Sequence, residues 1–491
     1  MLQKAISECI ALVLLMACYI LLNDDLIALD FLSFSQSIIN DYLAFFAKIS
    51  ICLFSAIYFL IIADSLKEQK LTSFEYLIVL LFAILGLVLL CSSNDLLTAY
   101  LAIELTSLAS YVLASFKKTS SYSIESGIKY FVTGAVSSAF FLLGSSLIYA
   151  ITGSINFSDF TDLFERQTFD NLDTFPCEHL ENDWDALLYC VMYFFMLEKF
   201  PPKLFDYSFA ELGLTLILFS LFIKLALAPF HLWSLDVYEG SPTSSTAFFA
   251  IIAKFSFFVL MIRLCYTSFF SINSCWQFYS LWVSVLSIFV GSFAGLRQRR
   301  LKTLLAYSST SHMGYSLLAF STNTYLGIQA LLFYMSIYML SGLCIWAIIL
   351  VLRMKRRSSL NKYSKELGDL SLLRKSNPLL AFAFSVPMFS IAGIPPLIGF
   401  LAKMNIFLSV VGISFYLIAL ITILCSVVST FYYIRIVKIL YFENLLVGKL
   451  YYPANTSQTL IISILVFFLV FLFINPTFVY LISYRVILSL T

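Results

Sequence analysis

Five ionisable side chains lie inside segments that are otherwise apolar, and their types are suited to carrying protons. Lys129, Lys224, Lys254 and Lys403 are surrounded in the sequence by Leu, Ile, Phe, Ala and Ser, and Glu104 lies in a similar stretch. A charged group inside a bilayer costs several kcal/mol, so such groups mark ion or proton paths. Moving a carboxylate toward or away from a lysine changes which of them holds the proton. The five side chains therefore predict a charge pathway.

The sequence around Lys224 predicts a broken helix. The stretch KLALAPFHLW places Pro229 between Lys224 and His231, and proline removes a backbone donor and disrupts the preceding turn. Inside a membrane such a break survives only where it faces protein or water. Lys224 and His231 would share a helical face if the helix continued. A histidine alone is more often a structural core residue, but beside Lys224 and the break His231 is a candidate relay.

A second break is predicted before Lys403. The stretch AGIPPLIGFLAKMN contains Gly393, Pro395, Pro396 and Gly399 ahead of that lysine. Broken spans at corresponding places in two halves of a chain are typical of transporters built from inverted repeats, with the site near mid-membrane.

The other candidates each have a structural alternative. Lys129 follows Glu125 by four positions, so the two could form a salt bridge near the interface. Glu104 could accept a hydrogen bond from a nearby Ser or Thr. Lys254 has no ionisable partner within one helical turn, so any partner lies on another helix. His312, within YSSTSHMGY, could be a relay or a structural donor.

Composition places the chain in a membrane. Its 491 residues are 61% hydrophobic and 12% charged, against roughly 25% charged in soluble domains. A net charge of +2 excludes a nucleic-acid role based on global charge. The sequence has no Walker A motif, no GxGxxG motif, and no haem, iron–sulfur or Cys/His metal pattern. We therefore expect no bound cofactor or metal.

Apolar stretches long enough to cross a bilayer predict an all-α polytopic fold with about thirteen transmembrane helices. The stretch 186–200 is apolar but short, and we expect it to be interfacial or part of a loop. The expected spans are 6–22, 41–63, 74–93, 96–116, 126–150, 210–233, 243–266, 276–295, 303–321, 326–353, 378–408, 411–439 and 459–483.

The two broken spans are the sixth and the eleventh, which predicts two inverted five-helix repeats. The expected divisions are N-terminal helices at 1–73, a first repeat at 74–266, a second at 276–439, and a C-terminal helix within 440–491. Because five is odd, the repeats would have opposite topology.

Loop charges predict the orientation. Basic residues cluster after even-numbered spans and so fall on one side, whereas the acidic loop 151–209 falls on the other. By the positive-inside rule, the basic side faces the cytoplasm or the mitochondrial matrix. We expect the acidic loop to be a solvated insertion, with docking of a partner as the alternative. The basic residues are Lys67, Lys70, Lys117, Lys118, Arg297, Arg299, Arg300, Lys302, Arg353, Lys355, Arg356, Arg357, Lys362, Lys365, Arg374, Lys375, Lys438 and Lys449.

Several segments together resemble the chain 2 family of NADH:ubiquinone oxidoreductase, the antiporter-like membrane subunits of respiratory complex I. The resemblance runs from about residue 40 to 440, and HLWSLDVYEGSPT resembles chain 2 more than its relatives, chains 4 and 5. The segments are LAIELTSLASYVLASF, SIESGIKYFVTGAVSSAFFLLGSSLIYAITG, FIKLALAPFHLWSLDVYEGSPTSSTAFFAIIAKFSFF, LKTLLAYSSTSHMGYSLLAF and AGIPPLIGFLAKMNIF.

The resemblance implies a role for each candidate. Glu104 matches the family's span glutamate, and Lys224 matches the broken-helix lysine that pairs with it. Lys129 matches the lysine that begins the following span, and Lys254 matches the central lysine. Lys403 matches the lysine of the second broken helix, the expected exit-side connection, and His231 matches a histidine of the polar axis. NADH, FMN, iron–sulfur clusters and quinone would belong to partner subunits.

The function expected is proton translocation in complex I of the mitochondrial inner membrane, beside membrane lipids and other membrane-arm subunits, including other antiporter-like chains. A Phe-rich composition, with 50 Phe, and the absence of a transit peptide favour organellar encoding. The alternatives are a stand-alone cation/proton antiporter, a non-conducting scaffold and a plastid relative of complex I. Two departures from the family pattern are one fewer N-terminal span and a longer acidic loop.

Overall fold

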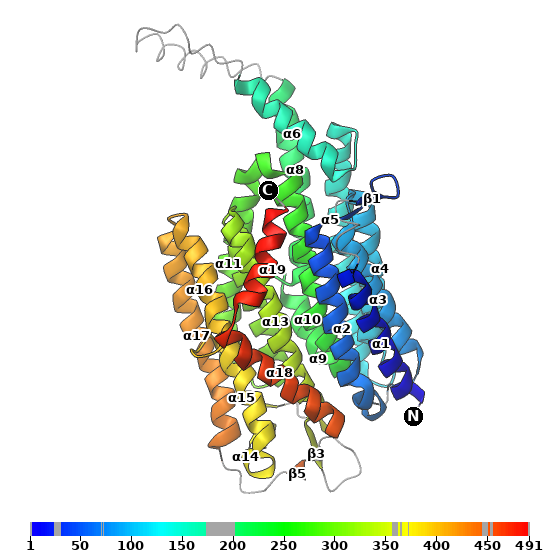
Figure 1. The fold of residues 1–491 in the computed structure, drawn as a ribbon, viewed down its shortest axis with the longest axis vertical. Helices are drawn as coiled ribbons and strands as arrows, with labels where there is room; N and C mark the ends of the chain where they lie inside the picture. The colour runs from blue at the N-terminus through cyan, green and yellow to red at the C-terminus, as the bar shows by residue number, and fades with distance from the viewer. Residues whose placement is uncertain are drawn as a thin grey trace.

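The computed structural model describes residues 2–23, 31–69, 71, 73–172, 202–355, 362–363, 366–371, 373–443, 450–451 and 455–489. Within them the chain is a bundle of helices, with short strands only near the ends of the bundle (Figure 1). The prediction of an all-α membrane protein is confirmed. Ten helices of the described part are long and apolar enough to cross a membrane.

The helices are bounded as follows. They are α1 (Leu2–Asn23), α2 (Tyr42–Glu68), α3 (Glu75–Ser92), α4 (Leu96–Ser115), α5 (Ser121–Thr152), α6 (Phe157–Leu172), α8 (Pro202–Leu225), α9 (Leu232–Gly240), α10 (Thr243–Ile262), α11 (Asn273–Gly295), α12 (Leu301–Phe320), α13 (Tyr325–Val351), α14 (Leu373–Ser376), α15 (Pro378–Ala392), α16 (Ile398–Gly412), α17 (Tyr416–Tyr441), α18 (Thr456–Ile474) and α19 (Thr477–Leu488). A π-helical segment, Arg263–Ser268, continues α10.

The strands form two small antiparallel sheets. In the first, β1 (Phe31–Ser33) pairs with β2 (Ile38–Asn40). In the second, β3 (Arg353–Lys355) pairs with both β4 (Lys362–Tyr363) and β5 (Leu450–Tyr451). None of the strands was expected from the sequence, because short edge pairings in loops carry no hydrophobic period.

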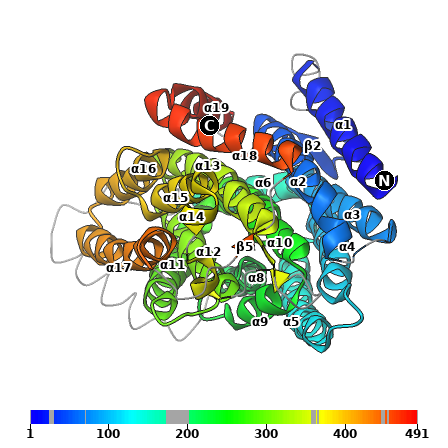
Figure 2. The same ribbon diagram turned by 90° about the horizontal axis from the view of Figure 1, so that it is seen from below.

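The core of the bundle lies around α10, α12 and α13. Almost all side chains of these helices are buried, whereas α1 and α18 lie at the periphery with most side chains exposed (Figure 2). A helix that is apolar on all sides is one that is enclosed by other helices or by lipid. The candidate ionisable residues on α10 and α12 are therefore enclosed by protein.

Both predicted breaks are present. The first span is interrupted between α8 and α9, where Ala226 has a φ of 56°. The second is interrupted between α15 and α16, where Gly393 has a φ of 84° and caps α15, as glycine commonly does in the left-handed conformation. The helix ends between Lys224 and His231, so the two residues flank the predicted break and do not share a continuous helical face.

The prediction of a single C-terminal helix at 459–483 is wrong. The helix ends at Ile474, and a new one begins at Thr477, after Asn475 and Pro476, since proline cannot continue the preceding helix. The second piece, α19, packs against α13 and α2 (Figure 2).

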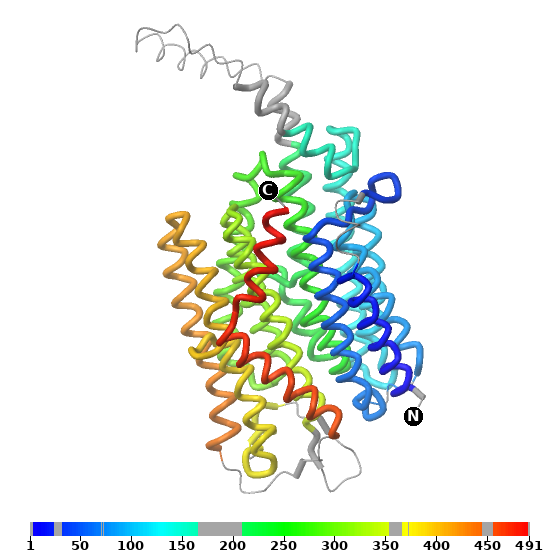
Figure 3. The backbone as a smooth tube through the Cα atoms, viewed as in Figure 1, coloured from blue at the N-terminus to red at the C-terminus, as the bar shows by residue number. Residues whose placement is uncertain are grey.

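Part of the acidic loop is helical, which the sequence analysis did not expect. Phe157, Phe160 and Phe164 lie on one face of α6 and are buried, with Phe160 and Phe164 packed 5.4 and 5.5 Å from the ring of Phe269. This helix lies at the opposite end of the bundle from α14 and β3 (Figures 1 and 3). The stretch 186–200 lies outside the described residues.

Candidate functional site

Five of the predicted residues form a row across the bundle. Glu104 lies on α4, Lys224 near the end of α8, Lys254 on α10, His312 on α12 and Lys403 on α16. Seen along the bundle, α4 and α16 lie on opposite sides, with α10 and α12 between them (Figure 2). In this view, the helices that carry the row follow one another from one side of the bundle to the other.

The first pair in the row is Glu104 and Lys224. Their charges interact, although their hydrogen bonds go to intervening hydroxyl groups. Ser107 donates to a carboxylate oxygen of Glu104 at 3.2 Å, and the Lys224 ammonium donates to the Tyr111 hydroxyl at 3.4 Å. The hydrogen bond expected as a structural alternative for Glu104 is therefore present, together with the lysine.

A pocket with room for about one water molecule joins Lys224 to α10. Ser107, Ser110 and Tyr130 line it together with Ala253, the neighbour of Lys254. Hydroxyl groups around a water-sized space can relay a proton by exchanging hydrogen bonds, and this pocket extends from Lys224 to the turn of α10 that carries Lys254.

Lys254 is the most isolated charge carrier of the row. Its side chain is 3% exposed, and its ammonium has no hydrogen-bond partner among the described residues. The nearest favourable group is the ring of Tyr238 on α9, whose centroid lies 5.8 Å from the Nζ atom. A buried ammonium without a partner is costly, which is characteristic of a functional rather than a structural role.

His312 is held at both ring nitrogens. Nδ1 hydrogen-bonds the Tyr334 hydroxyl at 2.6 Å, and Nε2 hydrogen-bonds the Tyr433 hydroxyl at 2.8 Å. The imidazole is buried and lies within electrostatic range of both Lys254 and Lys403. Because His312 lies between two lysines, its position supports a role as a proton relay more than a role as a structural hydrogen-bond donor.

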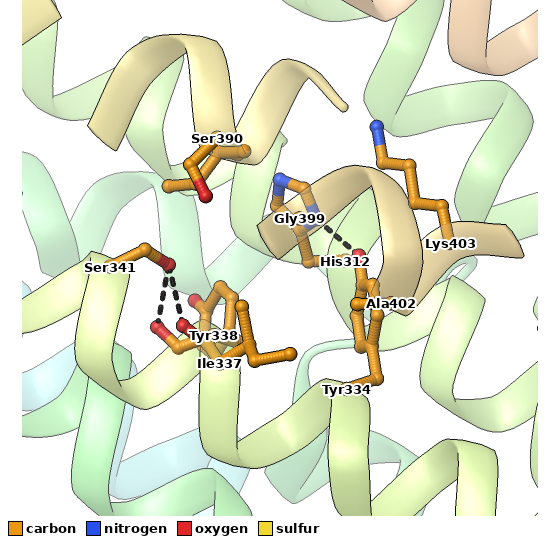
Figure 4. Close-up of a pocket in the computed structure, with 10 residues that line it drawn as sticks. His312, Tyr334, Ile337, Tyr338, Ser341, Ser390, Gly399, Ala402 and Lys403 are labelled. Atoms are coloured by element: carbon orange, nitrogen blue, oxygen red, sulfur yellow. Dashed lines mark hydrogen bonds between the residues drawn. The ribbon is translucent and has the colours of Figure 1, made fainter. Parts of the chain in front are cut away.

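Lys403 ends the row beside a second water-sized pocket (Figure 4). Its ammonium donates to the carbonyl oxygen of Ala392, the last residue of α15, at 2.8 Å. The pocket is lined by His312, Tyr334 and the Ser390 hydroxyl, which has no hydrogen-bond partner within the described part of the chain.

Lys224 and Lys403 share one local environment. Lys224 lies in the last turn of α8, whereas Lys403 lies on α16 and reaches back across the break with its ammonium to the last carbonyl of α15. Both ammonium groups are therefore beside a helix carboxyl end, where unpaired carbonyl groups and the helix dipole favour a cation. At the first break, Trp233 donates from its ring nitrogen to the carbonyl oxygen of Ile223 at 2.9 Å, which satisfies one of these carbonyls. The breaks thus supply the lysines with a polar setting inside the bilayer.

His231 lies at the start of α9, just after the first break. It is buried, its Nδ1 atom has no hydrogen-bond partner among the described residues, and its ring lies 6.1 Å from the ring of Tyr307. It is therefore near the row but is not hydrogen-bonded to Lys224.

Lys129 does not lie in the row. Its side chain is 44% exposed, and its ammonium pairs with Glu125 at 2.8 Å and with Asp236 of α9 at 2.7 Å. The salt bridge with Glu125 that was the alternative for Lys129 is therefore present, and the residue faces outward from α5. Its role in the charge pathway stays a prediction. The sequence gives its depth along the helix but not the face that packing turns outward.

We expect Lys129→Met to lower proton-coupled turnover by less than about twofold, because exposed ion pairs contribute little. The measurement is the rate of NADH-driven proton uptake in vesicles that carry the assembled complex. A tenfold lower rate of proton uptake, with the complex assembled normally, would mean that Lys129 belongs to the charge pathway.

The sequence analysis missed the tyrosines that connect the row, because tyrosine is abundant in this chain, with 29 residues. It also missed a buried ion pair at the α6 end of the bundle, where Arg263 contacts Asp41 at 2.7 Å. Near it, burial raises the pKa of Asp95 to about 6, with the charge of Asp159 acting in the same direction. This carboxyl can therefore exchange protons close to neutral pH.

Within the described residues, no group of three or more His, Cys, Asp or Glu side chains could hold a metal ion. The side chains of the row are lysine, glutamate, histidine and hydroxyl groups, which are groups that can exchange protons.

Comparison with known proteins gives a consistent result. The sequence profile described as NADH:quinone oxidoreductase/Mrp antiporter, TM, matches residues 93–429. The chain is 36% identical over 455 residues to NADH-ubiquinone oxidoreductase chain 2 of Marchantia polymorpha, covering 93% of this chain and 85% of the relative. It is also 36% identical over 411 residues to NADH-quinone oxidoreductase subunit N of Pelagibacter ubique, covering 84% and 78%.

Solved structures show the same fold. A chain of respiratory complex I from Thermus thermophilus superposes with a TM-score of 0.73 at 26% identity, covering 97% of this chain and 93% of that one. A chain of the Mrp complex from Dietzia sp. superposes with a TM-score of 0.79 at 16% identity, covering 99% and 93%, a likeness of fold alone.

Proposed function

Because the chain belongs to the antiporter-like membrane subunits of NADH:quinone oxidoreductase, as a homologue of chain 2 and subunit N, we propose that it translocates protons in complex I through the row Glu104–Lys224–Lys254–His312–Lys403. The observation that carries the proposal is the buried, unpartnered ammonium of Lys254 on α10, in a row whose flanking lysines, Lys224 and Lys403, each line a water-sized pocket. Lys129 and His231 are left outside the row as peripheral groups.

The proposed steps move one proton at a time. When the charge of Glu104 is balanced by Lys224, that lysine keeps its proton; when the pair separates, the proton is free to pass toward Lys254. Tyr111 and the hydroxyl groups of the first pocket lie between the donor and acceptor. From Lys254 the proton reaches His312 and then Lys403, whose ammonium is held at the end of α15.

The proposed topology has thirteen crossings. Besides the ten long helices, α12 would cross once, and the pairs α8/α9 and α15/α16 would each cross once as broken spans. Two repeats, 74–266 and 276–439, would then each have a broken fourth span, and their odd number of spans would invert one relative to the other. The division into these repeats remains part of the proposal.

The proposed location is the mitochondrial inner membrane, with the basic end facing the matrix and the acidic loop facing the intermembrane space. Arg297, Arg299 and Arg300 at the end between α11 and α12 support this orientation, and α6 lies at the other end (Figure 1). The partners would be other membrane-arm subunits and lipids. The redox groups NADH, FMN, iron–sulfur clusters and quinone would be bound by partners, since the family of this chain carries none of them.

The test is the proton yield of the assembled complex with Lys403→Met. Native electrophoresis with in-gel NADH oxidation first verifies that the chain migrates with the active complex. We expect a proton yield per NADH lowered by about threefold to fivefold, because loss of a positioned proton carrier slows transfer but the other antiporter-like subunits remain. Lys375→Met, at an exposed lysine of the basic end, is the control.

An unchanged proton yield in assembled Lys403→Met complex would contradict the proposal. A yield that depends on added Na⁺ would instead favour a cation/proton antiporter. Migration of the chain apart from NADH oxidation would favour a stand-alone transporter.

A further inference from the structure

We propose that the hydroxyl groups of Tyr432 and Tyr433 on α17 form an entry route that carries protons from the basic end of the bundle to His312. This inference rests on the function proposed above and adds a branch that supplies the row from one side of the membrane.

The route ends at a defined hydrogen bond. The Tyr433 hydroxyl lies 2.8 Å from Nε2 of His312, and the Tyr334 hydroxyl lies 2.6 Å from Nδ1. A neutral imidazole has one donor and one acceptor nitrogen, so one tyrosine donates to the ring while the other accepts from it. The three side chains come from α17, α12 and α13, so they join three helices in one hydrogen-bonded line.

The preceding step involves Tyr432. Its ring lies 4.5 Å from that of Tyr433, and its hydroxyl is near the hydroxyl groups of Ser311, Tyr433 and Ser429. The hydroxyl is fully enclosed, yet it has no hydrogen-bond partner among the described residues. A buried hydroxyl without a partner is costly, and an ordered water is the usual remedy. A water there would connect Tyr432 with Tyr433.

The other end of the route approaches the basic surface. Tyr432 packs on Gly295, the last residue of α11, where an added Cβ would lie 3.0 Å from the tyrosine ring. One turn further along α17, Arg435 donates to the carbonyl oxygen of Leu296 at 3.2 Å. Along α12, His312 lies about 16 Å from the first residue, Leu301, at 1.5 Å per residue. The route thus spans about half of a 30 Å hydrocarbon core.

The proposed transfer leaves no tyrosine ionised. Tyr433 passes its hydroxyl proton to Nε2 of His312 as it accepts a proton from the water beside Tyr432, and that water regains a proton from the basic end by way of the Tyr432 hydroxyl. The imidazolium then gives its Nδ1 proton to Tyr334, whose own proton passes through the pocket to Lys403 when that lysine has released its proton (Figure 4). His312 is then neutral with its proton on Nε2. A turn of the imidazole ring brings an unprotonated nitrogen back toward Tyr433 and, with rotation of the hydroxyl groups, resets the line.

The decisive variants are Tyr432→Phe and Tyr433→Phe in the complete complex, reconstituted in vesicles. Tyr432→Phe removes a hydroxyl that makes no hydrogen bond within the described structure, so assembly should be unaffected. We expect coupled turnover about fivefold lower at alkaline pH on the basic side, because a positioned proton relay is lost. The rate should recover as that pH is lowered, since slow uptake then rises with proton concentration.

The matched control is Tyr266→Phe, which removes a buried hydroxyl that donates to the carbonyl oxygen of Phe320 at 2.6 Å, away from the route. It should show the pH profile of the unmodified complex. An unchanged rate and profile in assembled Tyr432→Phe and Tyr433→Phe complexes would overturn the route. If Lys403→Met still lowers the proton yield in that case, only the entry route is wrong. If Lys403→Met also leaves the proton yield unchanged, the proposed function is wrong as well.

Discussion

Replacing Lys254 by Met should abolish most proton-coupled turnover while making the protein more stable. The Lys254 ammonium is buried between the two halves of the row and has no hydrogen-bond partner among the described residues. Methionine keeps most of the length of the side chain but loses the ammonium that approaches the ring of Tyr238, and it cannot carry a proton. We expect coupled turnover to fall by at least about tenfold, since positioned proton-transfer groups contribute about 10²–10⁴-fold.

Stability should change in the opposite direction. Removing a buried charge that nothing compensates and replacing it with an apolar side chain of similar size is neutral or stabilising, by about 1–4 kcal/mol in comparable cases. The measurements are NADH-driven proton uptake and the midpoint of thermal inactivation of the assembled complex. A residue with a structural role would lose both properties together.

The control for Lys254→Met is Lys118→Met, which removes an exposed positive charge at the basic end. It should alter neither proton uptake nor the thermal midpoint measurably. Normal proton uptake in Lys254→Met complex would mean that the row is not continuous at its centre, and the non-conducting scaffold would become the better description.

The breaks could be predicted from the sequence because they depend on local chemistry. The helices end a few residues before Pro229 and Pro395, where Ala226 and Gly393 have positive φ. Pro387, without such a neighbour, lies inside the continuous helix α15. Asn475 and Pro476 carry the same signal, yet the stretch around them was interpreted as one continuous span because it is uniformly apolar. Inside a membrane, a proline next to a turn-forming residue is therefore a better indicator of a helix end than the length of the apolar stretch.

The faces of the helices could not be predicted in the same way. In a soluble helix the apolar stripe indicates the buried side, but a helix surrounded by lipid and protein is apolar on all sides. Lys129 and Lys254 both lie in apolar stretches, and only Glu125, one turn before Lys129, distinguishes them in the sequence. Yet Lys129 is exposed and ion-paired, whereas Lys254 is buried and unpaired. The hydrogen-bond partners of His312 could not be predicted either. Tyr334 and Tyr433 are far apart in the sequence, and their local sequence does not differ from that of other tyrosines.

Glu104 and Lys224 should act as one unit, which a double-substitution cycle can measure. Their charges interact without direct contact, since each forms its nearest hydrogen bond with a hydroxyl group, Ser107 for the carboxylate and Tyr111 for the ammonium. We expect Glu104→Gln and Lys224→Met each to lower NADH-driven proton uptake by at least about tenfold.

The double variant should be no slower than the slower single variant, because groups that serve one step have non-additive effects. Two independent steps would instead multiply the losses to about a hundredfold, and that result would contradict the pairing. Glu75→Gln, at an exposed carboxylate at the start of α3, provides the control and should combine with Lys224→Met without any interaction. Non-additivity confined to Glu104 and Lys224 would mean that separating this pair is the event that releases a proton toward Lys254.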